Sequence, residues 1–278
     1  CDYAERRTAG VYRLLLATLM FYVVLFVLDK LRKVQRRDAV RIAATGVLLA
    51  LHWLFFYGSI KASNVSIGVV CLSLMSFFTA LFDPLINRHR VSASEVLFSL
   101  IGVAGIVLIF HFDTRYRVGI LMGILSSALA SLFTICNKRV ASDYPSGTVL
   151  LYEMGGGFAG LSLLLPFYLH FFPVTSLVPS AADWGSLLAL ASLCTVCLYI
   201  LQIQVLKRIS AFTFNLTYNL EPIYSIILAM IIFGEAKDLN ASFYAGLGMI
   251  FLSVVMQTLR VVRQMKKTLM LTKREEHR

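Results

Sequence analysis

The sequence has 278 residues, of which 58% are hydrophobic, and its mean hydropathy is +0.77. A soluble domain is nearer to about 45–50% apolar, so this composition excludes an ordinary soluble protein and predicts an all-α, polytopic membrane helix bundle. The net charge of +11 does not indicate a nucleic-acid partner, because Lys and Arg cluster at the ends of apolar stretches.

Nine apolar stretches have the roughly 17–25 residues that a helix needs to cross a bilayer. They cover residues 9–28, 42–59, 66–86, 94–110, 118–137, 147–171, 184–205, 210–233 and 241–259. The connections between them are short, which favours antiparallel neighbours. The segment 260–278 is basic, and we expect it to form a solvated helical extension.

Two ionisable residues lie inside the first and sixth predicted helices. Arg13 and Glu153 occupy equivalent places in the internal repeat described below, about one turn inside opposite faces of the membrane. We expect either side chain to reach water along its helix. The alternative for Arg13 is an ion pair with a substrate carboxylate or with Glu221.

Aromatic and imidazole side chains occur in the second and seventh predicted helices. His52 and Trp53 lie in the second, and Tyr199 has the position in the repeat that corresponds to Trp53. Such an aromatic pair is a candidate lining or gate of a solute pathway. The alternatives are ordinary packing and interface anchoring and, for His52, a hydrogen-bonded core residue.

Hydroxyl groups line one arc of the third predicted helix, on which Ser73 and Ser76 are candidate solute contacts. The alternative is that these hydroxyls bond back to their own helix. The fifth and sixth predicted helices carry small residues, including Gly119-x-x-x-Gly123 and Gly155-Gly156-Gly157, which predict close helix packing. Cys194 and Cys197 are interpreted as small buried side chains.

The eighth predicted helix carries a carboxyl group at its midpoint, followed by a proline. A carboxylate near the bilayer centre costs roughly 2.5–3.5 kcal/mol, so Glu221 is expected to face protein or a water-filled cavity, and Pro222 to bend the helix. Helical periodicity gathers polar side chains around Glu221 on one face, which predicts the wall of a solute pathway. These are Asn215, Tyr218, Asn219 and Tyr224. The alternative is a structural polar network between helices.

The distribution of Lys and Arg predicts the orientation. One alternating set of connections and the tail hold 19 of these residues, and the opposite set holds 6. Cytoplasmic loops are enriched in Lys and Arg. We therefore place the first set and the C-terminus in the cytoplasm, and the protein in the inner (plasma) membrane.

An internal repeat relates the two halves of the chain. A shift of 146 positions overlays residues 53–109 on 199–255 without a gap, while the fifth stretch, 118–137, has no upstream partner. We therefore expect an inverted repeat of five plus five helices, with one helix missing before Cys1. The predicted divisions are a first half over 1–110, a second half over 118–259 and the cytoplasmic tail over 260–278. Inverted repeats are common in secondary transporters.

The second half reads VLKRISAFTFNLTYNLEPIYSIILAMIIFGE and is followed by a Gly-containing helix. With Leu206-Lys207, Pro222 and Gly234-Glu235, it resembles the repeat of the drug/metabolite transporter superfamily, in its EamA-type ten-helix permeases. Arg13 lies at the usual Arg of that family's second helix. The third helix has Ser76 where the eighth has Pro222, which leaves open whether both helices bend.

The resemblance implies transport of a small polar metabolite, such as an amino acid, without ATP. We predict an exporter that works by alternating access, with the solute and the lipid bilayer as partners. Proton coupling and a homodimer are left open. The alternatives are a nucleotide-sugar-type carrier of the same superfamily and a membrane protein that only binds its ligand. The sequence has no catalytic or cofactor motif, so we predict neither an enzyme nor a cofactor.

Overall fold

The computed structural model describes residues 9–27, 34–88, 90–112, 116–141, 143–171, 181–218, 221–233 and 241–276. Within these ranges every regular element is a helix and there is no strand, which confirms the predicted all-α class. Six helical stretches of this part of the chain are long and apolar enough to cross a membrane, and two shorter apolar helices cover Tyr12–Val27 and Ala93–Ile109.

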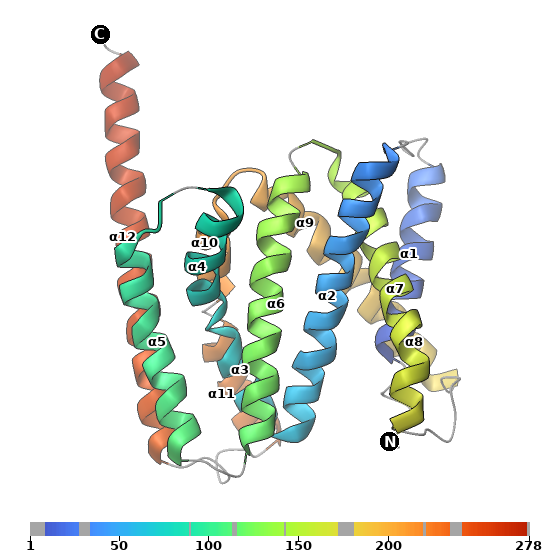
Figure 1. The fold of residues 1–278 in the computed structure, drawn as a ribbon, viewed down its shortest axis with the longest axis horizontal. Coiled ribbons are helices and arrows are strands. Elements are labelled where there is room, and N and C mark those ends of the chain that lie inside the picture. The colour runs from blue at the N-terminus through green and yellow to red at the C-terminus, as the bar shows by residue number, and fades with distance from the viewer. Residues whose placement is uncertain are drawn as a thin grey trace. The chain divides into compact units, whose positions relative to one another are not determined.

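Each predicted stretch coincides with one helix or with a divided one (Figure 1). The helices are α1 (Ala9–Val27), α2 (Arg36–Ala62), α3 (Val65–Leu72), α4 (Met75–Asn87), α5 (Ala93–Phe112), α6 (Arg117–Ala141), α7 (Ser146–Phe171), α8 (Ala181–Ala191), the π-helix η3 (Ser192–Cys197), α9 (Leu198–Leu206), α10 (Ala211–Tyr218), α11 (Glu221–Phe233) and α12 (Ala241–Glu276). The last of these confirms that the predicted extension is helical as far as Glu276.

The chain forms two compact units that differ from the two predicted halves. The first unit comprises Cys1–Leu54 with Leu132–Ile209, and the second Phe55–Ser131 with Ser210–Arg278. Each unit therefore takes helices from both halves. The chain passes between the units inside α2, inside α6 and between α9 and α10.

In the first unit, α2 and α7 meet backbone to backbone. A Cβ atom on Gly46 would lie 1.8 Å from the carbonyl oxygen of Glu153, and one on Gly156 would lie 2.2 Å from that of Ala43. Only glycine allows this approach, so the packing role predicted for the glycines of the sixth stretch is confirmed. Apolar side chains such as Leu14 complete the core of this unit.

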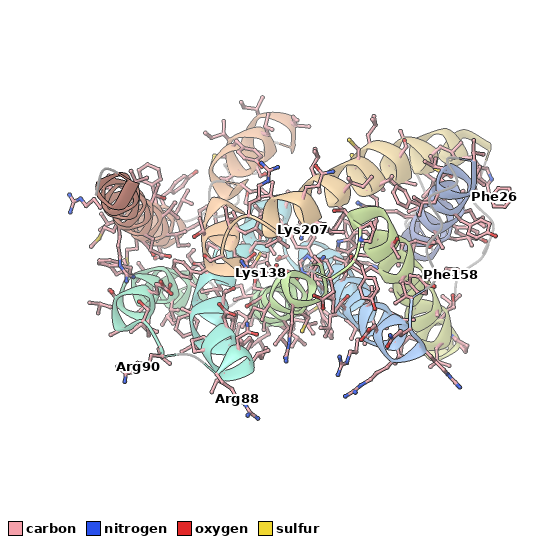
Figure 2. All side chains as sticks on the ribbon, turned by 90° about the horizontal axis from the view of Figure 1, so that it is seen from above. Phe26, Arg88, Arg90, Lys138, Phe158 and Lys207 are labelled. Atoms are coloured by element: carbon pink, nitrogen blue, oxygen red, sulfur yellow. The ribbon has the colours of Figure 1, made fainter. Side chains whose placement is uncertain are left out.

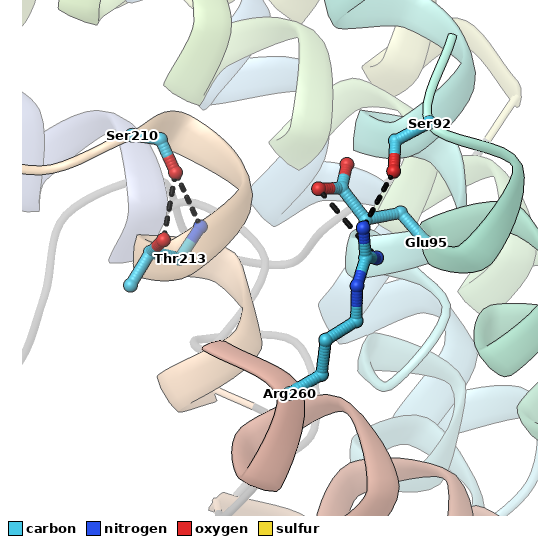
Figure 3. A network of polar contacts seen from close by, with 5 residues as sticks. All are labelled: Ser92, Glu95, Ser210, Thr213 and Arg260. Carbon is cyan, nitrogen blue, oxygen red and sulfur yellow. Dashed lines mark hydrogen bonds and ion pairs between the residues drawn. The ribbon is translucent and has the colours of Figure 1, made fainter. Parts of the chain in front are cut away.

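In the second unit, α12 runs beside α5 and continues past its end (Figure 1). A Cβ atom on Gly105 would lie 2.6 Å from the carbonyl oxygen of Gly246. Arg260 donates a hydrogen bond of 2.9 Å to Ser92 Oγ and lies 3.8 Å from the Glu95 carboxylate (Figure 3). Backbone packing and the polar contacts of Arg260 thus stabilise this helix pair.

The small residues of α6 form a packing surface, as predicted. Cβ atoms on Gly119 and Gly123 would each lie 2.6 Å from the Cβ of Ser63 and of Cys71. Ser59 Oγ also donates a 2.6 Å hydrogen bond to the Gly119 carbonyl oxygen. These contacts bring α6 against the end of α2 and against α3.

Hydrogen bonds tie together two connections that the charge pattern places on the same side. Lys207 Nζ donates to the Tyr144 carbonyl oxygen at 2.9 Å, and Lys138 Nζ donates to the carbonyl oxygen of Ile209. The α6–α7 and α9–α10 connections therefore lie together in the first unit. At the α4–α5 connection, Arg88 and Arg90 point away from their own unit (Figure 2).

Large apolar side chains cover much of the outside of each unit. Phe26 is 65% exposed, Leu163 75% and Ile231 74%. Exposed apolar surface of this extent suits lipid rather than water. The interpretation of Cys194 and Cys197 as buried was wrong: both thiols are free and exposed, because η3 turns Thr195 inward instead.

Candidate functional site

The third predicted membrane helix is interrupted at Ser73 and Leu74, between α3 and α4. Ser73 N donates to the Val70 carbonyl oxygen and Leu74 N to that of Cys71, both at 3.1 Å, so the chain makes a tight turn. Ser127 of α6 donates a second, 2.6 Å hydrogen bond to the Cys71 carbonyl oxygen. Neighbouring serines can satisfy backbone groups freed by such a break in a membrane helix.

The eighth predicted helix is described as two helical segments. α10 ends at Tyr218 and α11 begins at Glu221, directly before Pro222, and residues 219 and 220 lie outside the described residues. The bend expected at Pro222 therefore stays a prediction. The question left open for the third helix has an answer: it is interrupted at Ser73 and Leu74 without a proline.

A buried polar network joins three helices of the second unit. Asn215 of α10 donates to Thr79 Oγ1 at 2.7 Å, and Thr79 shares a 2.8 Å hydrogen bond with Ser131 of α6. Thr79 also lies 2.6 Å from the carbonyl oxygen of Met75. Among the residues that the structure describes, Asn215 Oδ1 is buried without a hydrogen-bond partner. An amide oxygen left in this state is a candidate acceptor for a solute.

The two serines predicted in this region are buried beside the break. Ser73 Oγ donates to the Val70 carbonyl oxygen at 2.7 Å, and Ser76 Oγ lies 3.4 Å from the Ser73 carbonyl oxygen. The hydroxyls therefore bond to their own helical segment, which is the alternative stated for them above. Glu221 is the first residue of α11 and is partly buried.

A second polar cluster, in the first unit, is built on Arg13 of α1. This side chain is buried; its Nε donates to Thr195 Oγ1 at 2.6 Å and its Nη2 to the Cys194 carbonyl oxygen at 3.0 Å. The guanidinium carbon lies 4.0 Å from the centre of the Trp53 ring. The expectation that Arg13 reaches water was wrong: its charge is held by hydrogen bonds inside the unit and by an aromatic face.

The aromatic pair predicted from the repeat is formed. The rings of Trp53 and Tyr199 meet edge to face with their centres 5.9 Å apart, and both side chains are buried. The structure therefore brings Arg13, Trp53 and Tyr199 together. Thr195, which the sequence analysis did not single out, joins them because the π-helix turns its hydroxyl toward Arg13.

Glu153 is the other residue for which the expected exposure was wrong. It is completely buried on α7, and Thr45 Oγ1 of α2 lies 3.0 Å from its Oε1. Its burial follows from the backbone contact between Gly46 and α7. The feature of the sequence that singled out Glu153 was its place as an acidic residue in an apolar stretch, at the position of the repeat that corresponds to Arg13.

The remaining predicted site residues are not part of these clusters. Tyr224 is 56% exposed, and His52 is partly buried on α2. Tyr218 ends α10, but its side chain lies outside what the structure describes, and Asn219 lies outside the described residues. Within the described part of the chain, no three His, Cys, Asp or Glu side chains come together in a way that could hold a metal.

Comparison with known proteins assigns the chain to a family. It matches the EamA-like transporter family over residues 3–111 and 117–259. It is 26% identical to the uncharacterized transporter YxxF of Bacillus subtilis (strain 168), over 85% of this chain and 75% of that one. The uncharacterized transporter YyaM of the same strain is 24% identical, over 82% and 77% of the two chains.

A solved crystal structure has the same fold, with a TM-score of 0.62 at 18% identity, over 91% of this chain and 87% of that chain. The resemblance seen in the second half of the sequence therefore extends along the whole chain, and the membrane helices suit a transporter. This protein is a multi-pass membrane protein that belongs to the EamA-like transporter family.

Proposed function

We propose that this protein is a secondary-active carrier that exports a small polar metabolite, such as an amino acid, by alternating access. The observation that carries the proposal is the interruption of the membrane helix between α3 and α4, together with the buried polar network of Thr79, Asn215 and Ser131 in the same unit. Discontinuous helices in inverted repeats place polar groups near the bilayer midplane, where solutes bind. A secondary carrier of this kind needs neither ATP nor a cofactor.

Residues beside the α3/α4 interruption and on α10 and α11 are the proposed solute contacts. Asn215 offers a buried amide oxygen without a partner among the described residues, and Glu221 is the first residue of α11. Ser73 and Ser76 donate to their own helical segment but can still accept a hydrogen bond from a solute. Tyr218, Asn219 and Tyr224, which periodicity predicts on the face of Glu221, complete this set. Hydroxyl, amide and carboxyl groups of this kind suit a polar solute with hydrogen-bond donors.

The Arg13 cluster is proposed to recognise an anionic group of the solute. Trp53 holds the planar guanidinium at 4.0 Å, and planar guanidinium groups favour paired hydrogen bonds to carboxylates. Tyr199 belongs to the same set through its ring contact with Trp53, and His52, the neighbour of Trp53 in the sequence, is proposed as a further member. A carboxylate is the anionic group that such a cluster suits, and it is present in an amino acid or a related compound.

The halves 1–110 and 118–259 are proposed to be inverted repeats in the inner (plasma) membrane. The family match in two stretches, 3–111 and 117–259, supports the repeat. The pairing of the α6–α7 and α9–α10 connections supports a common, cytoplasmic side for Lys138 and Lys207. The tail 260–278 then lies in the cytoplasm.

Proton coupling is proposed to depend on Glu221, because burial disfavours a charged carboxylate. The test is the complete protein in proteoliposomes, supplied with a panel of radiolabelled amino acids. Uptake driven by a pH gradient should occur with wild-type protein and be lost in Glu221→Gln, while solute exchange persists. Glu95→Gln, which removes a carboxylate at the end of α5, is the control and should keep gradient-driven uptake.

Two results would change this account. Gradient-driven uptake that persists in Glu221→Gln would remove Glu221 from the coupling step. Binding of a labelled solute without any flux would favour the alternative of a membrane protein that only binds its ligand.

A further inference from the structure

We propose that Glu153 is a proton-binding site: its side chain is a neutral carboxylic acid in this conformation, and it releases the proton when α2 and α7 separate. The first part stands on the geometry of the first unit alone. The second part rests on the proposed function, because alternating access supplies the movement.

The hydrogen-bond geometry around Thr45 favours a proton on Glu153, because the single hydroxyl hydrogen of Thr45 faces two acceptor oxygens. Thr45 Oγ1 lies 2.7 Å from the Ile42 carbonyl oxygen and 3.0 Å from Glu153 Oε1. A hydroxyl group has a single hydrogen, so it cannot donate fully to both acceptors. A proton on Glu153 Oε1 resolves the conflict, because Glu153 then donates to Thr45 and Thr45 donates to Ile42.

The surroundings of the second carboxyl oxygen of Glu153, Oε2, also favour the neutral carboxylic acid. In the part of the chain that the structure describes, Glu153 Oε2 is buried and has no hydrogen-bond partner. A carboxylate that leaves one oxygen unpaired in a dry interior is strongly disfavoured, whereas the carbonyl oxygen of a neutral acid tolerates it better. The unpartnered oxygen is therefore assigned to the C=O group of the acid.

No neighbouring charge supplies a counter-ion in the described part of the first unit. The helices packed against α7 carry these charged or titratable residues: Tyr12, Arg13 and Tyr22 on α1, Arg36, Arg37, Asp38, Arg41 and His52 on α2, and Tyr199 and Lys207 at α9. None of them forms a hydrogen bond or ion pair with Glu153 among these residues. Arg13 bonds to η3, and Arg41 lies 3.4 Å from the Asp38 carboxylate.

The contact between α2 and α7 keeps this acid dry. Gly46 lies against the backbone of Glu153 itself, Gly156 lies against that of Ala43, and Glu153 is completely buried. Small residues along such a seam let the two helices approach closely, and alternating access moves packed helices against one another. When the seam opens, water reaches the acid, the O–H bond breaks, the proton passes to water and the carboxylate is hydrated.

The test is infrared spectroscopy of the reconstituted protein at neutral pH. A protonated carboxylic acid has a carbonyl stretching band that carboxylates and amides lack. The difference spectrum between wild type and Glu153→Gln should contain this band. Gln keeps the shape and can donate to Thr45, so this variant should fold. Glu95→Gln is the control and should leave the band unchanged.

A second variant tests the hydrogen bond between Glu153 and Thr45. Thr45→Val keeps the carboxyl group but removes its partner, so the band should remain and change position. A Glu153→Gln difference spectrum without an acid band, or a band that Thr45→Val leaves in place, would overturn the proposal. Both readouts are independent of transport. An acid band without solute flux would therefore contradict the proposed function while leaving the proton site intact.

Discussion

Arg13 shows how a single charged residue is tolerated in an apolar helix. Removing a charge from water is costly unless hydrogen bonds and neighbouring groups replace the water. Arg13 has Thr195 and the Cys194 carbonyl oxygen as acceptors and the Trp53 ring as a flat neighbour. One side chain thus connects α1, α2 and η3, and it stabilises the first unit as well as the proposed solute site.

Arg13→Lys keeps the positive charge but removes the planar guanidinium group, so it tests the contacts of Arg13 with η3 and with Trp53. An ammonium group cannot reproduce both the stacking on Trp53 and the paired donors. We expect a loss of about 2 kcal/mol in the free energy of unfolding, from the desolvated cation–π contact and one charged hydrogen bond. Denaturant unfolding in detergent measures it. Arg41→Lys, at an exposed position, is the control; equal midpoints for the two variants would contradict the role given to Arg13.

At the scale of helices, two features are the α2–α7 seam and the interruption between α3 and α4. The seam relies on glycine because backbone atoms occupy the place of a side chain. The interruption relies on a group from another helix, since Ser127 of α6 donates a hydrogen bond to the Cys71 carbonyl oxygen there. Both features depend on contacts between elements that are distant in the sequence.

The seam can be tested with a matched pair of glycine substitutions. Gly46→Ala would place a Cβ atom 1.8 Å from the Glu153 carbonyl oxygen, so α2 and α7 must separate, at a cost of roughly 1–3 kcal/mol. A Cβ atom on Gly248 of α12 meets nothing within 4 Å, so Gly248→Ala should be neutral or stabilise by up to about 1 kcal/mol. Thermal unfolding measures both. A similar effect of the two changes would argue against the seam.

The sequence predicted the helices well because each apolar stretch carries its own signal. The break at Ser73 and Leu74 had no signal of this kind, because it depends on a hydrogen bond from Ser127 of another helix to the Cys71 carbonyl oxygen.

The burial of Arg13 and Glu153 could not be predicted from the apolar pattern. Whether a charged side chain in a membrane helix reaches water or stays inside depends on its partners. Those partners are Thr195, 182 positions from Arg13, and Thr45, 108 positions from Glu153. The Trp53–Tyr199 pair could be predicted, because the repeat relates the two residues directly.

At the scale of the whole molecule, each compact unit draws helices from both predicted halves. Two halves of opposite orientation can interleave in this way, whereas consecutive domains would fold side by side. The proposed membrane orientation rests on the charge distribution, with 19 Lys and Arg on one predicted side and 6 on the other.

A topology reporter tests that orientation. A reporter fused after Arg278 should read as cytoplasmic, because the tail is basic. One inserted within 173–179, a segment without Lys or Arg, should read as external. The reverse result for both fusions would invert the topology, and two readings on the same side would contradict the number of membrane crossings between them.

The central claim is that this protein carries a small polar solute by alternating access, and counterflow tests it most directly. Proteoliposomes of the complete protein are loaded with an unlabelled amino acid at high concentration and diluted into a trace of the same labelled compound. A carrier exchanges inner for outer solute, so the label should accumulate transiently above its equilibrium level, for at least one member of the panel. Label that only rises to equilibrium would indicate a channel, and no uptake beyond that of protein-free liposomes for any member would contradict transport of this solute class.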